Sequence, residues 1–379
     1  NPLLKSQEPT FRPPIEPQRV YFAGVSLTGN YKDNQKNTPF SVGMLDDLDS
    51  EMREVLKGKS FKYIDLVTSE LGDIRDADSL AVTLGVDLET VVVYPWPENK
   101  FKVVVDIYTQ LLFFDFAEKK VVRTVPINYQ YITLLKHKPS RKELKDIIYG
   151  MYVGKLDGVE KGVLQTVVEK LQNIIVQSRY KAYLKVENVE IGDRAQKMVD
   201  RFDMTSDQFK TLMAQMFVRS LVDNLAVAVI PYTVGQAIGG KMVGRFRNGV
   251  EYSLTMPEPD YVFDLSLRSC KTLRDEESSK TVDREVYMAL LKIKLTQKDL
   301  GTVYMDRVLR AVGEAALLKG QKGHLEVAYV ETLMGFFEGF ARSLIKKQKN
   351  WLDLVVPSDK VASLEQDLKR VSEVMPLCR

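Results

Sequence analysis

Gly235, Gly240 and Lys241 have the most distinctive chemical spacing in this chain. They match the G-x-x-x-x-G-K pattern of a P-loop and follow an apolar stretch typical of a buried strand. In a P-loop the residue after the lysine is serine or threonine, whose hydroxyl ligates magnesium, whereas Met242 offers only a thioether. Two interpretations stay open. The segment is either a degenerate phosphate or nucleotide site, or a short helix on which glycines up to Gly244 allow close packing against a neighbour.

Few residues could support other catalytic or metal chemistry. The chain has two histidines, His137 and His324, and two cysteines, Cys270 and Cys378. Neither pair has the local spacing of zinc ligands, and the acidic run that starts at Asp46 lacks the alternation and distal glutamate of a calcium loop. We therefore expect no catalytic residue, no metal site and no cofactor, although an enzyme that uses carboxylates alone stays open. The two cysteines form either one long-range disulfide or two free thiols.

The charge balance argues against nucleic acid as a partner. The chain has 54 Lys and Arg residues against 51 Asp and Glu residues, a net charge of +3, which is too close to neutral for a dedicated nucleic-acid binder. Basic clusters at residues 136–145 and 346–349 favour solvated faces, with contact to an anionic polymer, a lipid surface or an acidic partner as the alternative. No stretch reaches the roughly 18 consecutive apolar residues that cross a bilayer.

The chain begins with Asn1 and Pro2 rather than with Met. Residues 7–17 contain four prolines and therefore predict an extended tether before the first strand. A signal segment or a lipid-attachment cysteine upstream of Asn1 would already have been removed. The two interpretations are the tether of an envelope lipoprotein and an ordinary flexible terminus.

The first half of the chain predicts an open sheet with helices. Strands are expected at residues 20–25, 61–67, 90–94, 101–116 and 121–127, and the last two are joined by a polar hairpin turn. Helices are expected at residues 46–56 and from Asp76 or Asp78 through Leu84 to Gly85. The resulting order is β-α-β-α-β-β-β, a mixed α/β arrangement with an antiparallel hairpin.

A length of 379 residues with 45% hydrophobic composition favours two domains. Residues 142–219 have helical periodicity, and strands are expected again at residues 225–230, 252–256, 261–268, 285–295 and 302–306. Helices are expected at residues 313–318 and 324–347, and a last one is capped by residues 357–359. A long strand, a charged turn and a shorter strand occur in both halves, so a distant duplication and two unrelated hairpins are both open. The predicted division is an extended tether at 1–18, a first α/β domain at 19–135, a helical connector at 136–222, a second α/β domain at 223–312 and C-terminal helices at 313–379.

The first α/β region resembles the small α/β domain of TolB amino-terminal regions and of the curli-secretion lipoprotein group. The resemblance rests on the element order through residues 20–25, 77–85 and 101–127, and it covers about a third of the chain. Those families are envelope proteins that assemble, tether or transport without catalysing reactions. The resemblance therefore implies periplasmic scaffolding or assembly, and it assigns no functional residue.

We therefore predict a non-enzymatic protein of the cell envelope, periplasmic or associated with the outer membrane, that acts as a scaffolding, assembly or interaction protein. Its expected partners are other envelope proteins or a second copy of itself, with a membrane tether through the N-terminal end. Open edge strands make strand addition one mode of association. The alternative is a cytoplasmic nucleotide- or phosphate-binding protein that uses residues Gly235 to Lys241.

Overall fold

The computed structural model describes residues 17–28, 35–68, 80–177, 180–232, 241–246, 251–275, 281–319 and 323–379. The predicted mixed α/β class, with antiparallel hairpins and C-terminal helices, is confirmed. The described strands are β1 (Gln18–Thr28), β2 (Ile64–Val67), β3 (Leu80–Trp96), β4 (Lys100–Asp115), β5 (Lys120–Leu135), β6 (Leu184–Ile191), β7 (Val229–Ile230), β8 (Lys241–Phe246), β9 (Glu251–Thr255), β10 (Tyr261–Asp275), β11 (Val282–Gln297) and β12 (Val303–Leu318). The described helices discussed below are α2 (Leu45–Leu56), α3 (Arg141–Val153), α4 (Val163–Asn173), α5 (Asp193–Val199), α6 (Ser206–Leu225), α7 (Leu325–Ser343), α8 (Lys349–Val355) and α9 (Val361–Val374).

Two sets of strands repeat the same topology. In the first repeat, β2, β1 and β3 are parallel neighbours, and β3, β4 and β5 form an antiparallel meander. In the second repeat, β7, β6 and β10 are parallel neighbours, and β10, β11 and β12 form the meander. The sheet is continuous between the repeats because β7 also pairs with β5. The hairpins of the two halves are therefore parts of one repeated arrangement.

Three β-bulges fix the alignment of the repeats. The first strand of each repeat carries an extra residue after three pairs with its parallel neighbour, at Ala23 in β1 and at Glu187 in β6. The strand that pairs with it, β3 in the first repeat and β10 in the second, also carries an extra residue. This residue is Asp87 in β3 and Arg268 in β10, the same number of positions after the first residue of each strand. A third bulge lies near the start of β5 and of β12. Bulges shift the side-chain register, so their shared positions make the two repeats equivalent strand by strand.

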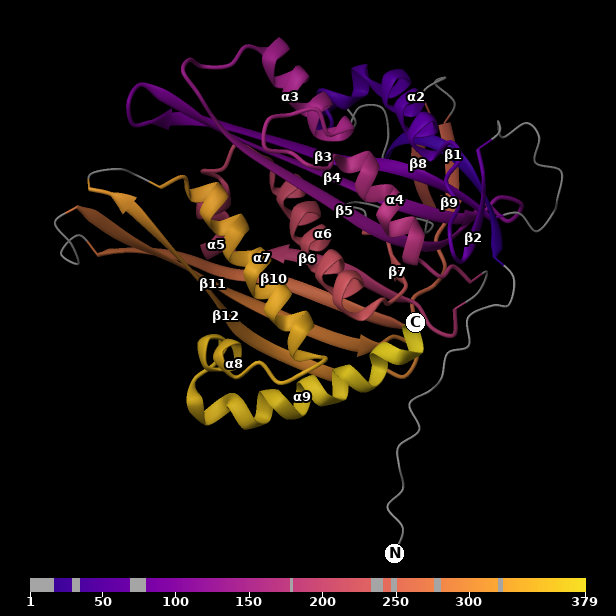
Figure 1. Ribbon diagram of the computed structural model, residues 1–379. Helices are drawn as coiled ribbons and strands as arrows, with labels where there is room; N and C mark the ends of the chain where they lie inside the picture. The colour runs from indigo at the N-terminus through magenta and orange to yellow at the C-terminus, as the bar shows by residue number, and fades with distance from the viewer. Residues whose placement is uncertain are drawn as a thin grey trace, which may run out of the picture.

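The helices form layers on the strands of each repeat (Figure 1). Helix α2 packs on β1, α4 packs on α2 and β5, and α7 packs on β11 and β12. Figure 1 draws α6 and α7 between the long strands of the two repeats. Helix α6 touches both of them: Phe217 packs edge-on against Phe263 of β10 at 4.8 Å between ring centroids, and Gln215 Nε2 donates to Asp87 Oδ2 of β3 at 2.8 Å. A helix packed between two parts of the sheet is buried on most of its circumference, and α6 is, with the polar Gln215 and Ser220 among its buried residues.

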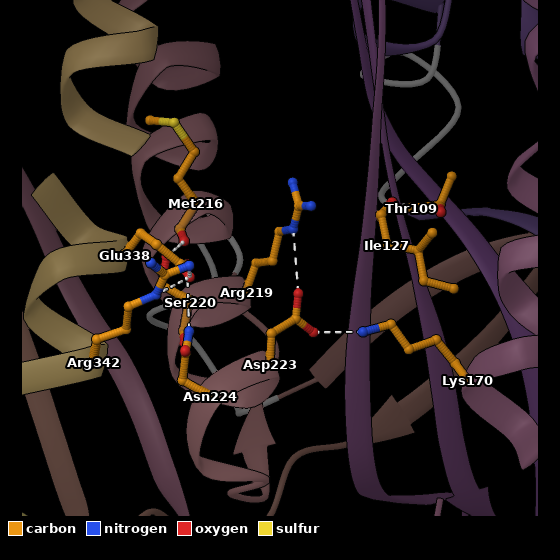
Figure 2. A network of polar contacts seen from close by, with 10 residues as sticks. All are labelled: Thr109, Ile127, Lys170, Met216, Arg219, Ser220, Asp223, Asn224, Glu338 and Arg342. Atoms are coloured by element: carbon orange, nitrogen blue, oxygen red, sulfur yellow. Dashed lines mark hydrogen bonds and ion pairs between the residues drawn. The ribbon is translucent and has the colours of Figure 1, made fainter. Parts of the chain in front are cut away.

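Polar contacts around α6 link three helices (Figure 2). Asp223 of α6 accepts from Lys170 Nζ of α4 at 2.6 Å and from Arg219 Nε at 3.4 Å. On another side of α6, Asn224 Nδ2 lies 3.3 Å from Glu338 Oε2 of α7, whose other oxygen accepts from Arg342. Helices of both repeats are thus joined through one turn of α6.

The β8–β9 hairpin is an insertion of the second repeat that packs on the first. Strand β8 pairs with β1, and Met242 of β8 lies fully buried in a small apolar cluster. The buried members of that cluster are Tyr21, Ala23, Ala81, Leu112, Phe114, Val121, Ile230, Met242, Leu254 and Met256. The hairpin therefore covers part of the sheet face of the first repeat.

Several predicted elements differ from the structure. The helix expected through Leu84 to Gly85 is wrong, because residues 80–85 begin β3, whose apolar run is buried against neighbours on both faces. The helix expected at 313–318 is also wrong, because this alanine-rich segment continues β12 through pairing with β11. Strand β6 interrupts the region expected to be helical, and only Val229 and Ile230 of the strand expected at 225–230 are extended. Most of the predicted tether, residues 1–16, lies outside the described residues.

Candidate interaction surface

One face of the second repeat's meander carries apolar side chains that are open to solvent. Along β11 the burial alternates strictly: Tyr287, Ala289 and Leu291 face the helices, and Met288 and Leu290 face away from them. The apolar residues on this side include Leu273 of β10, Val286, Met288 and Leu290 of β11, and Val308 and Val312 of β12. Leu273, Leu290 and Val308 are 43%, 41% and 51% exposed. We call the side of β10–β12 that bears these six residues the open face.

The charged side chains of the open face are mostly cationic. Its cations are Arg268, Lys271, Arg284, Lys292 and Lys294, and its described carboxylates are Asp264, Asp306 and Glu314. Arg310 has the same register, but its Nε donates to the Leu354 carbonyl of α8 at 3.0 Å. Arg284 is paired with Glu314, and Lys292 Nζ lies 2.9 Å from Asp306 Oδ1. The carboxylates are thus already partly matched within the sheet, and the face has an excess of positive charge around its apolar centre.

The equivalent face of the first repeat is covered by helices. Tyr108 of β4 pairs with the residue that follows the Asp87 bulge, and Leu290 of β11 pairs with the residue that follows the Arg268 bulge. Tyr108 and Leu290 therefore occupy equivalent positions in the two repeats. Two residues earlier in each strand stand Asp106 and Met288. In the first repeat these positions lie under α6 and α7, and the cavity left between helices and strands is only about 10 Å³. The helices line it with Leu212, Glu326, Val327 and Val330, and the strands line it with Thr90, Val92, Val104, Asp106, Tyr108 and Gln130. The same sheet positions are therefore buried in one repeat and open in the other.

The covered face of the first repeat contains two buried carboxyl groups. Asp87 accepts from Gln110 Nε2 at 2.9 Å, from Gln215 and from the Thr28 hydroxyl, and Asp106 accepts from Gln130 Nε2 at 2.9 Å and from Thr90. Burial raises the pKa of each carboxyl to about 6, although the hydrogen bonds oppose the shift. For Asp106 the nearby carboxylates of Glu326 and Glu331 raise the pKa further. All of these polar groups are satisfied by internal partners, so their arrangement is that of a packed interface.

The P-loop-like residues are only partly described. Gly235 and Gly240 lie outside the described residues, and Lys241 is the first residue of β8, paired with Thr255 of β9. The short helix expected to extend to Gly244 is wrong at that residue, which lies in β8. A Cβ at Gly244 would lie 2.2 Å from Cζ of Tyr252, so the expected close packing does occur there. Phosphate binding at Gly235, Gly240 and Lys241 stays a prediction.

The other candidate residues lie apart. His137 is exposed and lies 3.4 Å from Glu143, whereas His324 stacks on Tyr94 at 4.7 Å between ring centroids. Cys270 and Cys378 are free thiols, and burial raises the pKa of each to about 12. Across the described residues, His, Cys, Asp and Glu side chains form no group of three suited to a metal ion. Of the basic clusters, 136–145 contributes the start of α3, and Lys347 of the second pairs with Glu365.

The sequence contains a signal for the open face that the spacing of chemical motifs does not reveal. Residues 286–291 of β11 are continuously apolar, and residues 103–114 of β4 are mostly so, whereas apolar and polar side chains alternate only at the end of β11, around Lys292 and Lys294. Alternation is typical of a strand with one solvated face, and a continuous run is typical of a strand buried on both faces. Motifs of catalytic, metal-ligating or phosphate-binding residues carry no such information, because a docking surface needs none of those residue types.

No protein-family model matches this chain, and no curated protein matches it in sequence. Solved structures that are distantly similar include the following three. They are a minor lipoprotein from Acinetobacter baumannii (TM-score 0.26, 10% identity, 43% of this chain and 98% of that one), a neuraminyllactose-binding hemagglutinin homolog from Helicobacter pylori (0.24, 13%, 46% and 90%) and rare lipoprotein B from Shewanella oneidensis (0.21, 9%, 40% and 96%). No helix among the described residues is long and apolar enough to span a membrane. The chain thus has a distant structural resemblance to lipoproteins.

Proposed function

We propose that this protein is a non-enzymatic scaffolding or assembly protein of the cell envelope, and that the open face is its docking surface. The observation that carries the proposal is the exposure of Leu273, Leu290 and Val308 together on one regular sheet face. Isolated exposed apolar residues are normal, but a contiguous group with a polar rim is characteristic of an interaction site. The envelope location is the expectation drawn from the resemblance and from the proline-rich segment before β1.

The supporting contrast lies within the same chain. In the first repeat the equivalent positions are buried under α6 and α7. In the second repeat the strands carry apolar side chains at those positions, including Val286, Met288 and Leu290, although no described helix closes over them. A face that only needed to be solvated would carry polar residues there. The apolar side chains at these positions therefore favour a binding partner.

The test is site-specific photocrosslinking in cells, combined with fractionation. A photoreactive residue in place of Leu290 should give a discrete adduct in the envelope fraction. The same residue in place of Leu300, which is 74% exposed in the turn between β11 and β12, is the matched control and should give none. A cytosolic protein would contradict the envelope location. Equal adducts from both positions, or none from either, would contradict the docking surface.

A further inference from the structure

We propose that the open face binds an amphipathic helix of a partner protein, with an apolar stripe flanked by aspartate or glutamate residues. This inference rests on the proposed docking function and specifies the chemistry of the partner. Its first support is the precedent inside the chain, since helices α6 and α7 cover the same sheet positions in the first repeat.

The side chains that the helices contribute in the first repeat indicate what such a partner presents. Leu212, Val327 and Val330 supply the apolar contact, and Val327 and Val330 are three residues apart on one side of α7. Glu326 adds a carboxyl at the border of this contact, where it also accepts from the Asp203 amide at 2.8 Å. A helix that docks on the open face needs an equivalent stripe of apolar residues at helical spacing.

The charges of the two faces differ, and the difference determines which charged residues the docking helix carries beside its apolar stripe. Positions held by Asp87, Thr90 and Gln110 in the first repeat are held by Arg268, Lys271 and Lys292 in the second. In the first repeat, the carboxylate of Glu326 lies near Asp106, an unfavourable approach that raises the pKa of that aspartate. On the open face, Met288 replaces the aspartate and a lysine stands beside it. Carboxylates that flank an apolar stripe would therefore be attracted rather than repelled.

A second copy of this chain is a less suitable occupant. Two open faces that pack on each other would bring two sets of excess positive charge together, which opposes association. The solvated side of α2 is acidic, with Asp46, Asp47 and Glu54 exposed, but its apolar side, including Leu48 and Met52, is already buried on the sheet. The remaining occupant with the right chemistry is a helix from another protein.

The experiment uses the full chain and two synthetic helical peptides of about 18 residues, roughly 27 Å long. Both peptides carry the same leucine stripe, flanked by glutamate in one and by lysine in the other. Fluorescence anisotropy should show that the glutamate peptide binds at least about tenfold more tightly than the lysine peptide. The double variant Met288→Gln/Leu290→Gln should weaken binding about tenfold or more. The variant Leu300→Gln should bind like the original chain.

A charge-reversed variant separates electrostatic selection from loss of structure. Arg268→Glu/Lys271→Glu should reverse the preference between the two peptides while circular dichroism shows an unchanged fold. Equal binding of both peptides, or no binding of either, would overturn the inference. So would Leu290-dependent binding to vesicles of phosphatidylethanolamine and phosphatidylglycerol, or sedimentation of the chain as a dimer that Met288→Gln/Leu290→Gln dissociates. A discrete crosslink from Leu290 in cells without peptide selectivity would leave the docking function standing and reject only the acidic helix.

Discussion

Asp87 and Asp106 make the stability of the molecule depend on pH at the contact between the two repeats. Their pKa of about 6 in the folded state lies above the ordinary value of 3.8 that the unfolded chain keeps. The folded state therefore binds protons more tightly, so their contribution to stability is fully present below about pH 4 and is lost as the pH rises through 6. The difference between a pKa of 3.8 and a pKa of about 6 corresponds to about 3 kcal/mol for each group.

We expect Asp87→Asn/Asp106→Asn to remove this dependence. The free energy of unfolding, measured by urea denaturation at several values between pH 4 and 7.5, should fall with pH more steeply in the original chain than in the variant. The comparison must be made between the two proteins, because the lowered pKa of half-buried His324 contributes with the opposite sign. Parallel pH profiles would show that these carboxyl groups have ordinary pKa values in the folded protein.

Lys241 provides a test of the phosphate-binding alternative at the level of one side chain. A P-loop lysine stands at the start of a helix, whereas the backbone at Lys241 enters strand β8 and the next residue, Met242, is fully buried. We expect millimolar ATP or GTP with magnesium to leave the thermal midpoint unchanged, because only a ligand of the native state raises it. A clear rise that Lys241→Ala abolishes would instead establish a nucleotide site.

At the scale of single elements, substitution of two glycines tests whether a helix end contacts backbone atoms or a helix surface is open. Gly162 precedes α4, and a Cβ there would lie 2.4 Å from the backbone nitrogen of Gly154 and 2.4 Å from the carbonyl oxygen of Tyr152. Backbone atoms at the end of α3 cannot move aside as a flexible side chain can. We expect Gly162→Ala to lower the free energy of unfolding by about 1–3 kcal/mol.

Gly335 is the matched control for this substitution. It is exposed in the middle of α7, and no atom lies within 4 Å of the place that a Cβ would take. Gly335→Ala should therefore stabilise the protein by about 0.5–1 kcal/mol through helix propensity alone. Both variants are measured by the same denaturation, and equal effects would mean that α3 and α4 do not approach each other as described.

The elements also show which sequence signals were sufficient to predict secondary structure. The helix capped by Ser140 and the helix capped by Thr205 have complete capping boxes, and the sequence predicted helical structure around both. Residues 80–85 were predicted as a helix because an acidic residue precedes them and a glycine ends them. In the structure, pairing with β1 and β4 decides their conformation, and neither partner is adjacent in sequence. The apolar centre of the open face could have been predicted from the continuous apolar run at residues 286–291, but its equivalence to a covered face required the pairing register.

At the scale of the whole molecule, the second repeat completes the first. The inserted β8–β9 hairpin covers one part of the first repeat's sheet, and α6 with α7 covers another part. Without them, Tyr108 and Leu112 of β4, which are now 2% and 0% exposed, would face water. We therefore expect the two repeats to unfold together, although their strand topologies are separate and equivalent.

The two tryptophans of the chain report on this coupling, since Trp96 lies in β3 of the first repeat and Trp351 in α8 of the second. The single-tryptophan variants Trp96→Phe and Trp351→Phe should each show one fluorescence transition in urea, coincident with the transition in circular dichroism of that variant. Phe217→Ala, which removes the α6 side chain packed against Phe263, Phe337 and Phe340, should lower both transitions together by about 3–5 kcal/mol. In the contrary outcome, Phe217→Ala would leave the urea midpoint of Trp96 fluorescence, measured in Trp351→Phe, unchanged and would shift that of Trp351 fluorescence, measured in Trp96→Phe. The first repeat would then be stable alone. Its helix-covered face would then not depend on α6, and the precedent for a helix on the open face would lose its energetic basis.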